Sequence, residues 1–311
     1  MQNSDVLDKA ALDFYDKKRG LWLSWIHGQD VNSIWNQLHR LVWYYALFNI
    51  TNQARALSSR ANNGTIAING DISNLIDAGF ATIQATGIRA LCERNPQNTT
   101  RAVISVRRLL DDIEDTLPFL TRESFVASNG RPYDPEPARA RLFANLSQSG
   151  VIAYDTTGPD AWHESERLHK IFDSISDIPP TRRTRFDRVN PAIILRIKNS
   201  LSVCDDVKKY TDKFVAHFAD PQNRTKLTQR QVGLTLDRIS KCHRAIYRAT
   251  SFVLTGIIGT NDRSPIASVQ YDIVEFLDQP WVSQSDLVQL RKVWKDHVLT
   301  LDTWAKDPLK Y

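Results

Sequence analysis

Apolar residues recur every three or four positions along most of this chain, which is the spacing of one buried helix face. The run Ile34, Leu38, Leu41, Tyr45 and Phe48 is an example. Residues that break helices are scarce, because 12 glycines and 13 prolines in 311 residues make about 8%, against roughly 12% in an average protein. The pattern excludes a turn-rich sandwich or barrel. It predicts an all-α fold, a bundle of long antiparallel helices.

Local signals place the helix boundaries. Asn190-Pro191 is the clearest start, because asparagine caps a helix with its side chain and proline is favoured at the first helical position. Thr228, with Gln231 three residues later, fits a capping box that opens another long helix. The periodicity predicts helices at about residues 4–25, 30–60, 71–94, 100–117, 138–147, 160–175, 190–218, 228–258, 269–277 and 285–304.

Prolines and glycines interrupt the helical rhythm in one stretch. Pro118, Pro132, Pro135 and Pro137 fall within 20 residues of each other, and proline stops a helix or opens a turn. We therefore predict a loop-rich insertion that divides the bundle. The predicted organisation is the N-terminal helices of the bundle at 1–117, the insertion at 118–158, the C-terminal half of the bundle at 159–260 and a C-terminal helical extension at 261–311.

The charge of the chain is concentrated in one region. The net charge is only +5, but residues 171–250 hold 16 basic and 8 acidic residues, a net of +8, which leaves −3 for the remainder. Clustered arginine and lysine suit the phosphate backbone of RNA, whereas a solvated face balanced by Asp205, Asp206 and Asp237 would give the same composition. The predicted nucleic-acid-binding residues are Arg182, Arg183, Arg185, Arg188, Arg238, Lys241 and Arg248.

Signatures of several enzyme classes are missing from the sequence. It contains no GxGxxG, P-loop, GxSxG or complete HExxH motif, so we predict neither a metal nor a cofactor. The N-terminal stretch is polar, and the longest apolar stretch, near residues 252–258, is far shorter than the ~20 residues of a membrane span. These features predict a cytoplasmic protein without a membrane partner. Cys92, Cys204, Cys242 and His243 lie in helical patterns and are predicted as core residues.

One segment has residues suited to acid–base chemistry. His217 falls in the last turn of the helix predicted from Asn190, with Lys213 one turn before it and Asp220 three residues after it. Residues four apart share a helix face, so Lys213 and His217 are expected to lie together. Such a histidine beside a cation can act as acid or base in metal-independent cleavage of a phosphodiester. The alternative is that His217 caps the terminal carbonyls and packs on Phe214.

The same segment carries a family resemblance. The sequence Phe214-Val215-Ala216-His217, followed by Ala219-Asp220, resembles the motif-bearing helix end of HEPN domains, in particular the abortive-infection U-type (AbiU-like) branch. Arg94 with segment 102–113 (AVISVRRLLDDI) is similar to the upstream region of that branch, and segment 222–227 to its polar loop. The resemblance covers about residues 34–258. It implies a HEPN-type bundle that forms a homodimer, with metal-independent ribonuclease activity in active members and roles in phage defence or toxin–antitoxin pairs, where an antitoxin or other protein is the partner.

This sequence departs from the active family members at one position. Their arginine, which precedes the histidine by four to six intervening residues, would fall at Asp212, Thr211 or Tyr210. Lys213 is then the candidate substitute cation, and Asp212 or Asp220 the candidate orienting carboxylate for His217. Two hypotheses follow: an RNA-binding protein with weak metal-independent ribonuclease activity at His217, or a catalytically silent helical module for dimerisation or protein interaction.

Overall fold

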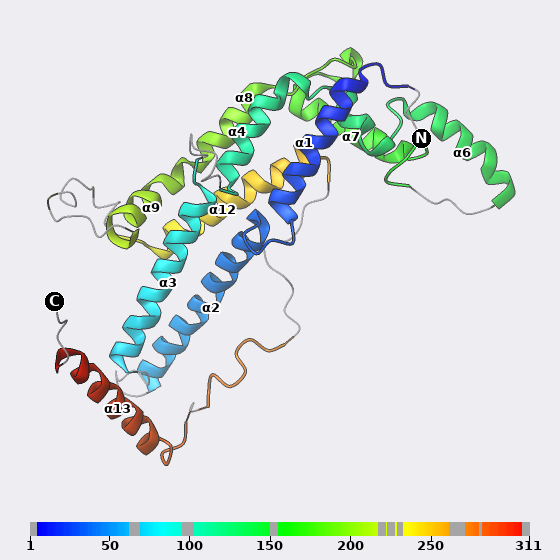
Figure 1. Cartoon of the computed structure of the whole chain (residues 1–311). Coiled ribbons are helices and arrows are strands. Elements are labelled where there is room, and N and C mark those ends of the chain that lie inside the picture. The colour runs from blue at the N-terminus through cyan, green and yellow to red at the C-terminus, as the bar shows by residue number, and fades with distance from the viewer. Residues whose placement is uncertain are drawn as a thin grey trace.

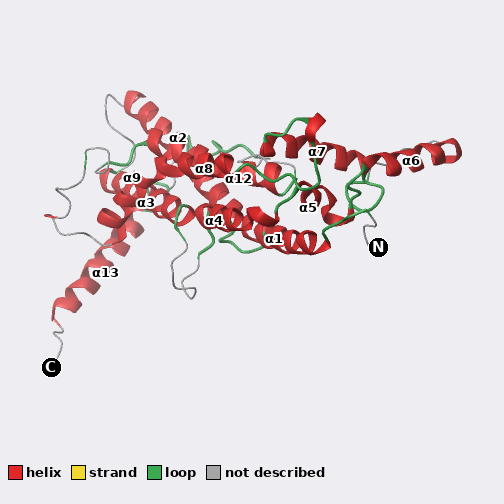
Figure 2. Cartoon of the chain, turned by 90° about the horizontal axis from the view of Figure 1, so that it is seen from above, coloured by secondary structure: helices red, strands yellow, loops and turns green. Residues whose placement is uncertain are grey.

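The computed structural model is built from helices, and none of the residues it describes lies in a strand of a sheet. It describes residues 5–61, 69–94, 103–149, 155–216, 222, 228, 233–260, 271–279 and 282–306. Figures 1 and 2 show long helices lying side by side, with α6 at one end of the molecule and α13 at the other. The prediction of an all-α fold is confirmed.

The main helices follow one another in the order that the periodicity predicts, with short 3₁₀ and π segments between some of them. They include the 3₁₀ turn η5 (Leu201–Cys204) and the π-helical segments η6 (Thr211–Ala216) and η7 (Val253–Ile257). The α-helices are α1 (Lys9–His27), α2 (Ile34–Ala61), α3 (Gly70–Leu91), α4 (Val106–Thr116), α5 (Arg122–Ala127), α6 (Pro135–Ser149), α7 (Trp162–Ser176), α8 (Pro191–Ser200), α9 (Asp205–Tyr210), α12 (Leu236–Phe252) and α13 (Leu287–Lys306).

Helices α2 and α3 run antiparallel and pack closely along one side of the bundle (Figure 1). The apolar stripe of α2 is buried at Ile34, Leu38 and Leu41, as its spacing predicts. Gly87 of α3 makes the close approach possible, since a Cβ at this position would lie 2.5 Å from Cδ2 of Leu41.

Helix α12 crosses the bundle and packs against α2, α3, α8 and η5. Its apolar stripe is buried, including Ile239 and Ile246. His243 lies on the same side: its Nε2 donates to Oε1 of Gln84 at 2.9 Å, and Nε2 of Gln84 donates to the carbonyl of Leu41 at 2.9 Å. Burial lowers the pKa of His243 to about 4, so the ring is neutral near pH 7. The prediction that His243 is a core histidine with its polar atom satisfied is confirmed.

The three cysteines meet in the core although they are far apart in the sequence. Cys92, Cys204 and Cys242 are all free and buried. Hydrogen bonding with the thiols of Cys242 and Cys92, together with burial, raises the pKa of Cys204. The thiol of Cys204 is therefore held in the protonated, unreactive form. The burial of all three cysteines agrees with their predicted role as small core residues.

The structure differs from the predicted boundaries of two helices. Helix α12 begins at Leu236 rather than near Thr228; Thr235 caps it by accepting a hydrogen bond from the backbone N–H of Arg238, and residues 233–235 are not helical. Residues 271–279 form turns instead of the short helix expected at 269–277. At the first place Thr235 acts as the cap in place of Thr228. At the second, the apolar spacing that predicted a helix is not accompanied by one.

The stretch 118–158 holds more structure than its prolines indicate. Besides α6, it contains α5, whose six residues are all buried. Thr121 begins α5 with a capping box formed with Ser124. Phe125 packs on Tyr15 of α1 and on Phe172 of α7. Helix α5 is therefore part of the core, and the sequence pattern did not reveal it.

Candidate functional site

The helix expected at 190–218 runs from Pro191 to Ala216 but changes its hydrogen-bonding pattern three times. Asn190 caps it as predicted, by accepting a hydrogen bond from the N–H of Ala192. It then passes through η5 and α9 and ends in the π-helical segment η6. The hydroxyl of Thr211, the first residue of η6, lies 2.8 Å from the carbonyl oxygen of Val207 and 3.1 Å from that of Ala85 on α3. Because π segments often occur at functional sites, this end of the helix is a candidate functional site.

Segment η6 brings the predicted site residues Asp212 and Lys213 to the surface beside α3. Nε of Arg89 donates to Oδ1 of Asp212 at 2.7 Å, and Arg89 also lies 3.7 Å from a carboxylate oxygen of Glu93. Arg89 of α3 therefore lies beside Asp212, one of the three positions at which the resemblance to HEPN domains would place an arginine. The predicted residues His217 and Asp220 lie outside the described residues.

Two of the predicted RNA-binding arginines make internal contacts. Arg183 binds both carboxylate oxygens of Asp173, at 2.9 and 2.5 Å. Arg185 donates to Oε1 of Glu123 at 2.6 Å and stacks over the ring of Tyr133, 4.1 Å from its centroid. Their guanidinium groups hold the loop before α8 against α5 and α7, and this structural role occupies donors that a phosphate would need.

The two other arginines of that loop, Arg182 and Arg188, are exposed. The backbone of Arg188 pairs with that of Thr121 in an isolated antiparallel bridge, which ties the loop to the start of α5. These two side chains therefore project from a loop whose backbone is fixed, so they remain candidates for contact with a phosphate.

The basic residues of α12 form a separate face. A guanidinium nitrogen of Arg238 donates to the carbonyl of Gly233 at the start of the helix, and Nζ of Lys241 pairs with Oδ2 of Asp237 at 2.7 Å. Lys241, Arg244 and Arg248 are exposed and follow one another by three and four residues, so they point to the same side. This α12 face lies on a helix packed against η5 and α2. The loop before α8, which carries Arg182, Arg183, Arg185 and Arg188, packs instead on α5 and α7. The predicted basic residues thus occupy two separate surfaces.

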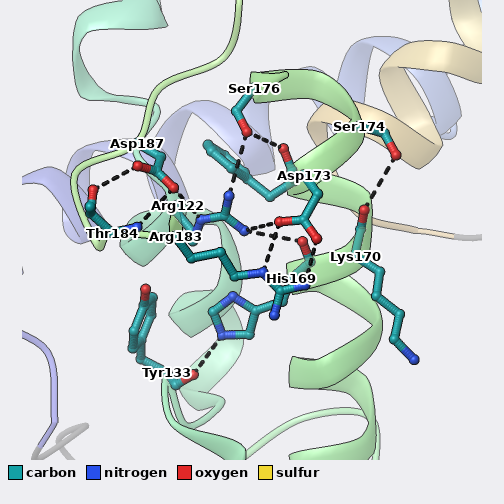
Figure 3. A network of polar contacts seen from close by, with 11 residues as sticks. Arg122, Tyr133, His169, Lys170, Asp173, Ser174, Ser176, Arg183, Thr184 and Asp187 are labelled. Atoms are coloured by element: carbon teal, nitrogen blue, oxygen red, sulfur yellow. Dashed lines mark hydrogen bonds and ion pairs between the residues drawn. The ribbon is translucent and has the colours of Figure 1, made fainter. Parts of the chain in front are cut away.

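The strongest polar network of the described chain is centred on Arg122 (Figure 3). Its side chain is 0% exposed, and it reaches Oδ2 of Asp187 and Oδ1 of Asp173, each at 2.8 Å. It also donates to the carbonyl of His169 at 3.1 Å. Burial alone would raise the pKa values of Asp173 and Asp187, but hydrogen bonds outweigh it and lower both: those from Arg183 and Arg122 for Asp173, and those from Thr184 and Arg122 for Asp187. The network joins α5, α7 and the loop before α8.

His169 sits at the edge of this network (Figure 3). Its Nε2 lies 2.8 Å from the carbonyl oxygen of Tyr133, which can only accept, so Nε2 has the hydrogen. Burial lowers the pKa of His169, and the nearby charges of Arg122 and Arg183 lower it further, against the hydrogen bond to Tyr133. Nδ1 is buried and has no hydrogen-bond partner among the described residues.

A shallow pocket of about 310 Å³ lies beside His169. Its charged groups are largely neutralised by neighbours, because Arg183 binds Asp173 and Arg139 lies 3.4 and 3.9 Å from carboxylate oxygens of Glu136 and Glu166. The pocket therefore has no net charge that would select a ligand. It is lined by Pro135, Glu136, Glu166, His169, Lys170 and Arg183.

Sequence reasoning missed Arg89 and Arg122. Their partners are 123 residues away for Arg89 (Asp212) and 51 and 65 residues away for Arg122 (Asp173 and Asp187), so no local pattern could pair them. The spacing of His169, Asp173 and Ser176 along one face of α7 is the available hint that α7 faces a polar partner.

The fold and these sites define an all-α protein with an outward cationic helix face and a buried arginine–carboxylate network. Comparison with protein-family models, with curated proteins and with solved structures finds no match for this chain. Within the described part of the chain, no helix has the length and apolar character needed to cross a membrane. Within the same residues, no group of three histidine, cysteine or acidic side chains is arranged to hold a metal ion.

Proposed function

We propose that this protein is a HEPN-type helical protein, of a prokaryotic defence or toxin–antitoxin kind, that binds RNA through the α12 face. The observation that supports it is the row of exposed cations Lys241, Arg244 and Arg248 on one side of α12. The opposite side of α12 is buried at Ile239 and Ile246, so the helix cannot turn and the cations stay on the surface. A fixed row of cations suits a phosphate backbone, and such binding releases counterions.

Replacing Arg244 and Arg248 with alanine is expected to weaken RNA binding at every sequence tested, because phosphate contacts are independent of sequence. For single-stranded RNA, losing two phosphate contacts lowers the slope of log K against log salt by about 1.4. Fluorescence anisotropy with a labelled single-stranded RNA, between low and moderate salt, measures both effects. The matched control is Lys9→Ala with Lys17→Ala, which removes the same charge from the exposed side of α1. Equal weakening by both variants would reduce the effect to net charge and reject the α12 face.

A second candidate function, metal-independent RNA cleavage at His217, is supported by the position of Arg89. Lys213 alone offers a point charge, whereas a guanidinium can bind two oxygens of a phosphate at once. Arg89 reaches the same segment from α3, with its Nε on Asp212 and a further nitrogen 3.7 Å from Glu93. Segment η6 therefore combines a lysine with a neighbouring arginine, and a phosphate would compete with these two carboxylates for the guanidinium. In this proposal His217 is the acid or base and Asp220 orients it.

Wild-type protein is then expected to cleave RNA in EDTA, and His217→Ala is expected to lose at least about 100-fold in rate, the usual contribution of a general acid or base. Gel analysis of a labelled RNA after incubation in EDTA measures the rate. Arg89→Lys retains the charge but loses the guanidinium, so its cleavage rate is expected to lie between those of wild type and His217→Ala. Undiminished cleavage by His217→Ala would exclude the assigned site. RNA binding without cleavage by any variant would favour the catalytically silent module.

A further inference from the structure

Helix α13 exposes a large apolar surface. All its described side chains except Leu287 are exposed. A continuous apolar patch formed by several exposed large side chains is rare on isolated soluble proteins and marks a surface that meets a partner. The large apolar side chains concerned range from 37% exposed at Val298 to 70% at Trp304, and they are Val288, Leu290, Val293, Trp294, Val298, Leu299, Leu301 and Trp304.

Most of these residues lie on one side of α13. Leu290, Trp294 and Leu301 are separated by four and seven residues, which are multiples of about one helical turn, and Trp304 follows Leu301 by three. The flank of this stripe is basic, since α13 has four lysine or arginine residues and two aspartates. The surface that covers α13 should therefore be apolar, about as long as the helix, and acidic.

The outward face of α3 has these properties. Ile72, Leu75 and Ile83 are 45%, 73% and 43% exposed, and Leu57 of the neighbouring helix α2 is 61% exposed. Small residues, alanine, glycine and threonine, separate them and leave room for bulky side chains. Between Gly70 and Ile88, α3 contains two aspartates and no basic residue. Asp77 pairs with Arg55 of α2 at 2.7 Å, so Asp71 is the acidic group of this face that meets the basic flank of α13. Its 22 residues span about 33 Å, against about 30 Å for the 20 residues of α13.

Within one chain these two faces do not cover each other, since both remain exposed. In Figures 1 and 2, α13 lies at the end of the molecule formed by α2 and α3 and is directed away from the other helices. We propose that α13 of one copy packs on the outward face of α3 of a second copy, and that the reciprocal contact completes a two-fold dimer. This interface does not depend on RNA binding by α12.

The area supports a reciprocal contact. A stable interface takes about 800 Å² from each partner. Two tryptophans contribute roughly 300–500 Å², and the stripe adds four further large apolar side chains, Leu290, Val293, Val298 and Leu301. In a two-fold dimer each copy supplies both faces, so the contact between α13 and α3 is made twice and each copy buries both surfaces.

The first test is the mass of the full-length protein in solution, measured by size-exclusion chromatography with multi-angle light scattering. Wild type is expected to be a dimer at micromolar concentration. Leu290→Asp with Trp294→Asp places two charges in the apolar stripe and is expected to give a monomer. Val288→Asp with Thr303→Asp adds the same charges to the opposite side of α13 and should leave the dimer intact. The proposal is overturned if the wild-type protein is a monomer. It is also overturned if the variant with Leu290→Asp and Trp294→Asp remains a dimer.

The second test identifies the partner of α13. A chain with Leu75→Cys is mixed with a chain with Trp294→Cys, and the mixture is oxidised; the three native cysteines are buried. A covalent dimer containing one chain of each kind is expected. The double variant Leu75→Cys/Trp294→Cys is expected to cross-link into dimers as well. If the double variant forms the disulfide only within itself and migrates as a monomer, α13 packs on its own chain and the proposal fails.

Discussion

Replacing Arg122 with methionine is expected to lower the free energy of unfolding by about 3–5 kcal/mol, the usual cost of removing one partner from a buried ion pair. The guanidinium is 0% exposed and pairs with two carboxylates, Asp173 and Asp187, that are 15% and 5% exposed. Methionine fills much of the same volume but leaves these carboxylates without their buried cation. The guanidinium also lies over the ring of Phe172, 4.9 Å from its centroid. The cost comes mainly from uncompensated charge and little from losing this contact.

Urea unfolding followed by circular dichroism measures this loss, and two further variants test its cause. Arg141→Met makes the same substitution in an ion pair with Asp160 in which both side chains are 57% exposed, so its effect should stay below about 1 kcal/mol. Adding Asp187→Asn to Arg122→Met removes one stranded charge and should restore part of the stability. A loss under 1 kcal/mol in Arg122→Met would mean that the carboxylates find other partners or are protonated at little cost.

The Arg122 network also marks the limit of what the sequence could predict. Stripes on single helices were predictable, since Leu38 and Leu41, or Ile239 and Ile246, share a face by spacing alone. The cap at Asn190 was predictable because its hydrogen bond reaches only two residues along the chain. The network depends on contacts across more than 40 residues, which no local pattern encodes.

The candidate site at η6 could be predicted only in part, for the same reason. The sequence places Asp212 and Lys213 near a helix end, and the structure shows both in η6 with half-buried side chains. It could not reveal that Thr211 begins a π segment, because that geometry is linked to a contact with Ala85 on another helix. Nor could it supply Arg89, whose role depends on how α3 packs against α9 and η6.

Acidification is expected to destabilise the protein through His243. Burial holds its pKa near 4 in the folded state, against an ordinary value of 6.5. Below about pH 6.5 the unfolded chain binds a proton that the folded chain does not, so stability falls as the pH falls and is fully present only above 6.5. The shift corresponds to about 3 kcal/mol in total, of which about 2 kcal/mol is lost by pH 5. His169 and the carboxyls of Asp173 and Asp187, whose pKa values are also lowered, add to the loss in the same direction.

The contribution of His243 is isolated by comparing slopes. His243→Gln retains a donor for Gln84 but does not titrate, so its free energy of unfolding, measured in urea at several pH values from 7 to 5, should fall by about 2 kcal/mol less than that of wild type. His163→Gln makes the same substitution on the exposed side of α7 and is the matched control. Since Gln84 is 0% exposed and bonded to both His243 and Leu41, a charged ring at 243 has no carboxylate in this chain of hydrogen bonds to balance it. Parallel slopes for wild type and His243→Gln would show that the ring is protonated in the folded core at no cost. The pH dependence between 7 and 5 would then arise from His169, since Asp173 and Asp187 take up protons only at lower pH.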